Sequence, residues 1–294
     1  MEIKDVEGII NKNFNYRKSL GIPEDVNFGI EIEVNDINYV KLEKRIKKML
    51  DGTYKVKADM SIAETGAEVI SPILHDNKET WNGLLKISNA IKNLDHSFFN
   101  SSFQVNFDLD LLKDDIDLLY FIKYFVIYEN ILYRFSLSND MFFRTCIDRY
   151  AKPLIYRVIS FRSMNNNIMF LKSSLLNKKS HSISIKDLPD KYSRQILEFR
   201  MPNGCDNAIL WQNYISCFYY LLSYFGHDYD KEKIDYDFGN ISKIESTNEY
   251  KTIDLSKAIQ FANDIFISEE DKEYFIKQYI GNPINYGLVR SLIK

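Results

Sequence analysis

Residues 28–34, with the sequence FGIEIEV, alternate between apolar and polar positions. Since successive side chains of a β-strand point to opposite faces, this pattern predicts a strand with one apolar face and one face that carries Glu31 and Glu33. Two neighbouring carboxylates on one face repel each other. Two interpretations stay open at this point: a strand face exposed to solvent, or a site where a divalent cation relieves the repulsion.

The same alternation recurs in four later segments. Their polar positions carry acids, amides and an arginine: Asp59 in 54–59, Glu68 in 66–71, Gln104 and Asn106 in 98–110, and Glu198 and Arg200 in 195–201. Residues 181–186 alternate more weakly and are compatible with a further strand. If these strands share a sheet, one face gathers groups that can hold divalent cations and a polyphosphate.

Segments with apolar residues at helical spacing separate the strands. The pattern predicts helices over 3–19, 38–50, 77–94, 114–135, 207–224, 254–265 and 268–279, whereas the polar segment 226–252 is typical of a loop. Parallel strands usually read as continuous apolar runs, and most of these strands are half polar. We therefore expect an α+β fold with a mainly antiparallel sheet and helices packed on one face.

Composition narrows the range of partners. Hydrophobic residues form 45% of the 294-residue chain, which is enough to fill a sizeable core. The formal net charge of −3 gives no general attraction to nucleic acid or to an anionic membrane. The apolar runs are interrupted or too short to span a bilayer. We expect neither nucleic acid nor a membrane as a partner.

The cysteine pattern and the first residues bear on location. Cys146, Cys205 and Cys217 form no CxxC pair and leave one cysteine unpaired, which favours reduced thiols. The first residues lack the apolar core of a signal peptide. A cytoplasmic location is therefore expected. The sequence also contains no P-loop, no dinucleotide fingerprint and no HExxH motif, and its four histidines are not at zinc-ligand spacing.

Several short motifs follow one another in a defined order. They are FGIEIE, D-x-S with GAEVISPIL, SSFQVNFDL, RYAKPL and ILEFRMPNG. In this order and spacing, from about Asn27 to Tyr219, the chain resembles the amidoligase family. That family belongs to the superfamily of carboxylate–amine ligases that includes glutamine synthetase and glutamate–cysteine ligase. The resemblance implies a catalytic domain of this kind over residues 1–225, and we expect 226–294 to be a helical C-terminal extension packed on the same domain.

The resemblance also implies a function and a set of site residues. The open face of the sheet would bind ATP and Mg²⁺, and the enzyme would join a carboxylate to an amine through an acyl phosphate. The implied assignments are Glu31, Glu33, Glu68 and Glu198 as metal ligands, Gln104, Asn106, Glu198, Arg149 and Lys152 at the nucleotide or substrate, Arg200 at the transferred phosphate, and Asp59 or Glu64 as the base. The substrates would be small-molecule or peptide carboxylates and amines, and the sequence does not identify them.

Two departures from the family pattern affect these assignments. Ser102–Asn106 replaces a Gly-x-His-x-His strand, and amides cannot carry a proton near neutral pH. Cys205 stands where a threonine often follows the Asn-Gly pair. The base stays open between Asp59 and Glu64, and for Glu64 a solvated loop acid is the favoured interpretation. Basic residues that either clamp the nucleotide or are surface charges are Arg134, Arg144, Arg149 and Lys152.

Other function classes stay open beside the ligase. One is a non-catalytic descendant of the family that binds a nucleotide or a peptide, and the missing histidines favour it. Another is a metal-dependent phosphotransferase or hydrolase that uses the same cradle of carboxylates. Retention of the repelling carboxylates on one face argues against a mere scaffold.

Overall fold

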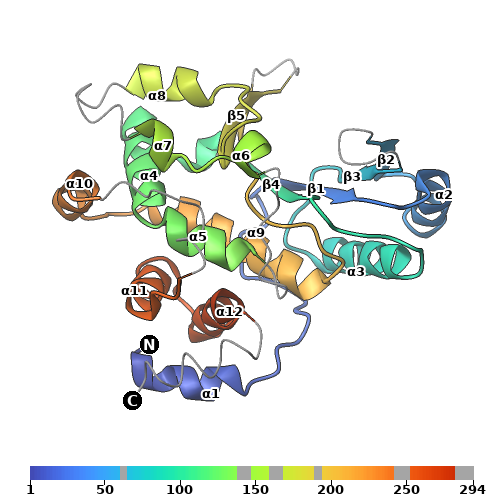
Figure 1. Cartoon of the computed structure of the whole chain (residues 1–294), viewed down its shortest axis with the longest axis horizontal. Coiled ribbons are helices and arrows are strands. Elements are labelled where there is room, and N and C mark those ends of the chain that lie inside the picture. Colours follow the sequence, from blue (N-terminus) through green and yellow to red (C-terminus); the bar gives the residue numbers. More distant parts are fainter. Residues whose placement is uncertain (60–64, 138–146, 159–167, 189–193, 242–251, 282–294) are drawn as a thin grey trace.

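The computed structural model describes residues 1–294 except 60–64, 138–146, 159–167, 189–193, 242–251 and 282–294. In this part of the chain, a six-stranded sheet has the order β2-β3-β1-β4-β6-β5. Figure 1 shows β2 and β3 at the opposite end of the sheet from β5. Its strands are β1 (Phe28–Val34), β2 (Lys55–Ala58), β3 (Ala67–Ile70), β4 (Phe103–Asp108), β5 (Ile183–Asp187) and β6 (Gln195–Phe199). Every neighbouring pair is antiparallel. The expected α+β class with a mainly antiparallel sheet is confirmed.

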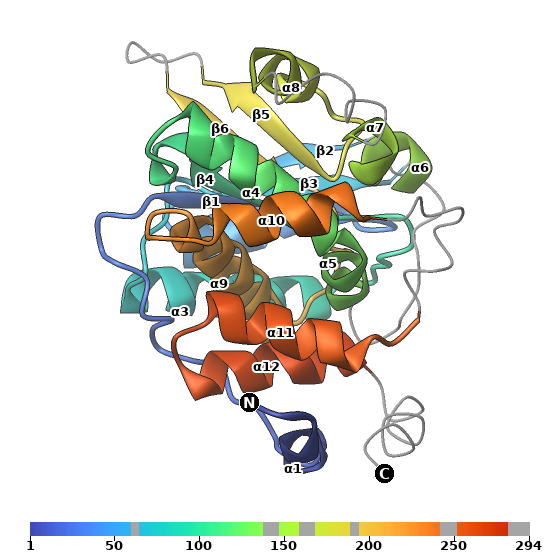
Figure 2. The same cartoon turned by 90° about the vertical axis from the view of Figure 1, so that its left-hand side faces the viewer.

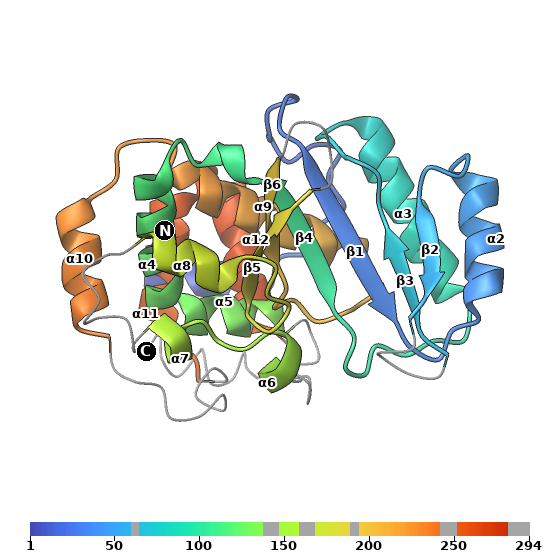
Figure 3. The ribbon, with the colours of Figure 1, turned by 90° about the horizontal axis from the view of Figure 1, so that it is seen from above.

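Helices make up most of the remaining framework. They are α1 (Val6–Ile10), α2 (Tyr39–Met49), α3 (Lys78–Lys92), α4 (Asp115–Ile127), α5 (Glu129–Ser136), α6 (Ile147–Tyr150), α7 (Ile155–Val158), α8 (Ile168–Leu175), α9 (Ala208–Tyr224), α10 (Lys231–Gly239), α11 (Leu255–Ile265) and α12 (Glu269–Ile280), with 3₁₀ turns at Ile3–Asp5 and Leu109–Leu111. Figure 2 shows α3 and α9 on one side of the sheet, with α11 and α12 in a further layer beyond α9. Figure 3 shows the other side, where the strands β1, β3 and β4 face the viewer and α6, α7 and α8 lie beside β5.

No helix within the described ranges has both the length and the apolar character that a membrane crossing requires.

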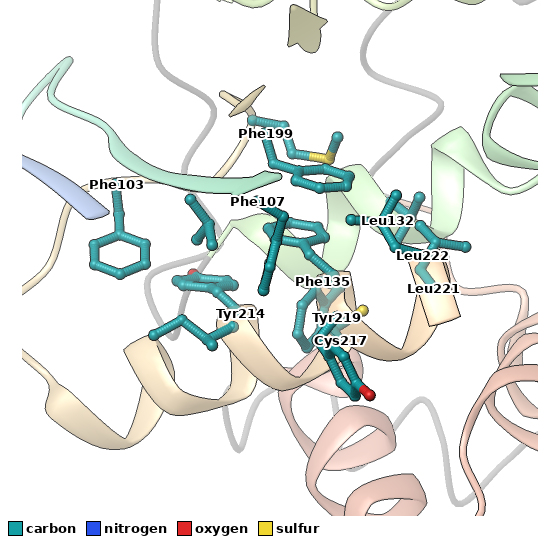
Figure 4. Packing of buried hydrophobic residues seen from close by; sticks show 14 of the residues in the cluster. Phe103, Phe107, Leu132, Phe135, Phe199, Tyr214, Cys217, Tyr219, Leu221 and Leu222 are labelled. Atoms are coloured by element: carbon teal, nitrogen blue, oxygen red, sulfur yellow. The ribbon is translucent and has the colours of Figure 1, made fainter. Parts of the chain in front are cut away.

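The helix-covered face of the sheet forms the hydrophobic core. The apolar residues of β1 are buried, while Glu31 and Glu33 between them are partly exposed, as the alternation predicts. Aromatic rings fill the layer between the sheet and α9 (Figure 4). Phe199 is stacked on Phe218, with ring centroids 4.1 Å apart. Cys217 lies in this layer and is a free thiol. Cys146 is outside the described residues. The core therefore fixes one face of the sheet and leaves the opposite face for chemistry.

The helix predicted over residues 3–19 is much shorter, since α1 ends at Ile10. The residues that follow make contacts with distant elements in place of helical hydrogen bonds. The backbone N–H of Arg17 donates to Oε1 of Gln212 at 2.8 Å, and its carbonyl accepts from Nε2 of Gln212 at 2.7 Å. The Arg17 guanidinium is paired with Asp271 at 2.5 Å. These contacts draw the segment across α9 and α12, which overrides its helical pattern.

The loop predicted over residues 226–252 is also wrong in part, because it contains α10. Asp230 caps this helix, as its side chain accepts a hydrogen bond from the Lys233 backbone N–H at 2.9 Å. Ile234 is buried, and α10 packs against α4. The segment is polar overall, but one buried residue and a good N-cap are enough for this helix to form. The predicted division of the chain at residue 226 stays a prediction.

Gly204, in the segment after β6, lies where a side chain has no room. A Cβ atom added there would overlap Oγ of Ser101 and would lie 2.9 Å from Cδ1 of Phe98 and 3.2 Å from the Glu33 carbonyl oxygen. The Gly204 backbone N–H also donates to the Ser101 carbonyl at 2.9 Å. Close backbone approach therefore explains the glycine of the Asn-Gly pair, and it fixes the chain next to Glu33.

We predict that Gly204→Ala lowers the free energy of unfolding by about 1–3 kcal/mol, because the added methyl group must push backbone and side chains apart. Urea unfolding monitored by circular dichroism measures this change. Gly8→Ala is the matched control, since no atom lies within 4 Å of its added Cβ. Equal stability of Gly204→Ala and the wild type would contradict the packing argument.

Candidate functional site

The open face of the sheet brings together the polar residues that the alternation singles out. Backbone pairing places these residues opposite one another in three pairs: Glu33 with Glu68, Glu31 with Gln104, and Asn106 with Glu198. Side chains of directly opposite residues on one face lie close together. Segments separated by more than one hundred positions in the sequence therefore contribute to one surface.

A pocket of about 590 Å³ lies over this face. Its acidic lining comes from β1, β3 and the residue after β2, and its basic lining comes from β5, the residue after β6, α6 and the segment before β5. The acids are Glu31, Glu33, Glu68 and Asp59, and the basic residues are Arg149, Lys179, Lys186 and Arg200. A smaller pocket of about 210 Å³ adjoins it at Glu31 and is lined by Gly29, Ile73, Asn106 and Ile196 among others. The site is thus an elongated depression with opposite charges at its two sides.

Three carboxylates form the acidic side. One oxygen atom each of Glu33, Asp59 and Glu68 lies within 4.8 Å of the others. Carboxylate oxygens are the ligands that Mg²⁺ and Ca²⁺ prefer, so this donor set fits a hard divalent cation. Glu33 is held in place by two donors, the Ser102 backbone N–H at 2.8 Å and Nε2 of Gln104 at 3.0 Å.

Burial, followed by the neighbouring charges of Glu31, Glu33 and Asp59, raises the pKa of Glu68 to about 7. The cause is physical crowding: several negative charges share a partly desolvated surface. Glu68 is therefore the carboxyl group in this cluster that most readily carries a proton near neutral pH.

Glu198 forms the centre of the basic side and is fully buried. Its Oε1 is paired with Nη1 of Arg200, and its Oε2 with Nζ of Lys186. The same Lys186 ammonium lies 3.8 Å from Oε1 of Glu31. The predicted metal ligands are thus divided: Glu33 and Glu68 join Asp59 in one cluster, whereas Glu198 is neutralised by two basic side chains.

The amides in β4 connect the two sides. Gln104 donates to Glu33 through Nε2 and accepts from Nη1 of Arg200 at 2.9 Å through Oε1. Asn106 donates to Oε1 of Glu31 at 3.3 Å and lines the smaller pocket. The two amides predicted to contact the nucleotide or substrate therefore already position the charged groups around them.

The basic residues predicted to clamp a nucleotide have different locations. Arg149 lines the pocket, and its guanidinium lies 5.2 Å from the ring centroid of Tyr150. Arg200 donates through Nε to the Tyr150 carbonyl at 3.2 Å. Lys152 is exposed and does not belong to the pocket lining within the described part of the chain. Its backbone pairs with the segment that leads into β5.

Contrary to the prediction, Arg134 neither clamps a ligand in the pocket nor is a surface charge; it has a structural role. Its side chain is buried and donates to the carbonyls of Tyr279 at 3.0 Å and Ile280 at 3.3 Å. These carbonyls belong to the last turn of α12, where a cation is favourable. Two other predicted residues, Glu64 and Arg144, lie outside the described residues.

Glu129, Lys179 and Lys186 are among the polar residues that were not predicted from the sequence. Glu129 is fully buried and accepts hydrogen bonds from the backbone N–H groups of Leu154 and Ile155, at 2.6 and 2.9 Å, and from the Ser182 hydroxyl at 2.8 Å. Burial raises the pKa of Glu129 to about 7 in spite of these three donors. It thereby anchors the segment that follows Tyr150.

A signal for Lys186 was present in the sequence. Residues 181–186 alternate, and the alternation places Ser184 and Lys186 on the same face of β5. The pairing of Ser184 with Glu198 aligns that face with the site. Glu129, by contrast, lies on a helix and had no comparable pattern.

Comparison with known proteins yields no assignment for this chain. It matches neither a model of a known protein family nor any of the curated proteins. The resemblance to amidoligases therefore rests on the short motifs alone. The geometry of the pocket is the other observation that bears on function.

The raised pKa of Glu68 predicts how stability depends on pH. The pKa of Glu68 in the folded state lies above its value in the unfolded state, so the folded state binds more protons between these two values. The free energy of unfolding therefore falls as pH rises from about 4.5 to about 7. Glu68→Gln removes this titration. In a metal-free buffer with chelator, the variant should exceed the wild type in unfolding free energy by about 1 kcal/mol at pH 8, a value reduced for solvent screening.

At pH 4 the wild-type carboxyl is protonated and the difference should disappear. Urea unfolding at both pH values measures it, with Glu24→Gln, an exposed site, as the control. A stability difference that does not change with pH would contradict the assigned environment of Glu68.

Proposed function

We propose that the protein is an ATP- and Mg²⁺-dependent ligase that joins a carboxylate to an amine and forms an amide or peptide bond. The observation that carries this proposal is the division of one pocket into an acidic side and a basic side. A polyphosphate with a bound divalent cation has the same division, because the cation needs carboxylate ligands and the phosphate oxygens need cations. The motif order that resembles amidoligases supports the same conclusion.

Glu33, Asp59 and Glu68 would hold the magnesium ion. When bound, the ion supplies neutralisation of the phosphate oxygens. Arg200, Lys186 and Arg149 would face the same oxygens from the opposite side of the pocket. Arg200 is well placed for this role, because Gln104, Glu198 and the Tyr150 carbonyl fix its guanidinium.

The chemistry proceeds in two steps. A carboxylate oxygen of the acid substrate attacks the γ-phosphorus of ATP, the bond from that phosphorus to the bridging oxygen breaks, and ADP leaves with the electron pair. The amine nitrogen then attacks the acyl carbon, phosphate leaves, and the amine proton passes to a base. The base stays open between Asp59, which would then act in place of its role as a metal ligand, and Glu64, which lies outside the described residues. The adjoining pocket of about 210 Å³ offers room for part of a second ligand.

One observation favours a second function, that of a protein that binds a nucleotide without catalysis. Glu198, Arg200 and Gln104 already satisfy one another, which also suits a protein that binds a nucleotide without turning it over. Release of phosphate distinguishes the two functions.

The experiment incubates the purified protein with ATP, Mg²⁺ and a panel of amino acids and short peptides, and measures phosphate and amide products. A ligase should release phosphate only when Mg²⁺, an acid and an amine are all present. Glu31→Gln and Glu33→Gln should each lower the rate of phosphate release about a hundredfold or more, because the site loses a negative charge that attracts its cations. Glu24→Gln should keep the wild-type rate.

Two outcomes would contradict the ligase. Binding of Mg-ATP without turnover across the whole panel would favour the binding protein. Phosphate release that does not depend on any amine would favour a phosphotransferase or hydrolase.

A further inference from the structure

We propose that Lys186 is a fixed cation of this site. Its ammonium, and not a second metal ion, neutralises Glu31 and Glu198, so that the pocket takes one divalent cation at its acidic side. The proposal refines the proposed function, and it depends on that function only for the identity of the anion as a nucleotide.

The position of the ammonium group is the first argument. Lys186 comes from β5, at the edge of the sheet, and its Nζ is in direct contact with Oε2 of Glu198 in the neighbouring strand β6. The same Nζ lies 3.8 Å from Oε1 of Glu31 in β1, which is separated from β6 by β4. One ammonium therefore bridges carboxylates from two strands, as a metal ion shared between them would do.

The burial of Glu198 is the second argument. Its side chain is fully buried, and its other oxygen is paired with Arg200. A buried carboxylate requires a nearby positive charge, because the uncompensated charge is strongly destabilising. Lys186 supplies that charge permanently, since the residue belongs to the chain itself. A divalent cation at the same position would repel the ammonium and would first have to displace it.

The surroundings of the ammonium give the third argument. Lys186 is only partly buried and lines the pocket of about 590 Å³. Its charge therefore faces a ligand as well as the two carboxylates. Arg200 and Arg149 line the same pocket, so an anionic ligand would meet three basic side chains opposite the cluster of Glu33, Asp59 and Glu68.

The test counts bound Mn²⁺ by equilibrium dialysis, with the full chain and without nucleotide. Lys186→Met should bind one more equivalent of Mn²⁺ than the wild type, because the carboxylates of Glu31 and Glu198 then become available. Adding Glu198→Gln to this variant should remove the extra equivalent. Lys186→Arg, which keeps the charge, and Lys178→Met, an exposed lysine outside the pocket lining, should both give the wild-type count.

Equal Mn²⁺ counts in the wild type and Lys186→Met would overturn the proposal, as would an extra equivalent that persists after Glu198→Gln. Thermal unfolding provides a second measurement if Lys186→Met is poorly stable. Mn²⁺ at about 100 times its dissociation constant should raise the midpoint temperature of this variant by about 5 °C more than that of the wild type, and an equal shift would also overturn the proposal. Because neither assay involves ATP turnover, the result stands whether or not the ligase activity is found.

Discussion

The buried carboxylate of Glu198 is the constraint on which the site depends. It lies in the sheet without solvent contact and is paired with Arg200 on one oxygen and Lys186 on the other. A buried charge that is left without compensation typically destabilises a protein by about 3–5 kcal/mol, and two basic partners prevent this at Glu198. Through Arg200 and Gln104 the network reaches Glu33, so the charged groups of β1, β4, β5 and β6 are positioned together.

The amide of Gln104 has a physical reason for its place in this network. It donates to Glu33 and accepts from Arg200 at the same time. A neutral histidine could also donate and accept, but protonation would remove its acceptor. An amide keeps both roles at every pH. Gln104 is thus suited to a site that works through positioned charges.

Much of the fold could be predicted because strand alternation is a local property. The pattern in 28–34 predicted which face of β1 is buried. Alternation also predicted that Gln104, Asn106 and Glu198 share the face of Glu31, but it did not predict that Gln104 and Glu198 are themselves buried there. The contacts of Lys186 could not be predicted, because they depend on strand order and register. Helix α1 is shorter than predicted because the residues that follow it, including Arg17, contact distant segments. Helix α10 was not predicted because its polar composition contains only one N-cap and one buried residue that favour a helix.

The most direct test of a one-metal nucleotide site is a crystal structure of the protein with Mn²⁺ and a non-hydrolysable ATP analogue, in which anomalous scattering locates the metal. We expect one Mn²⁺ position per pocket, bound by Glu33, Asp59 and Glu68, with the triphosphate between that ion and the side chains of Arg200 and Lys186. A nucleotide bound away from this face of the sheet, or a Mn²⁺ ion between Glu31 and Glu198, would contradict it.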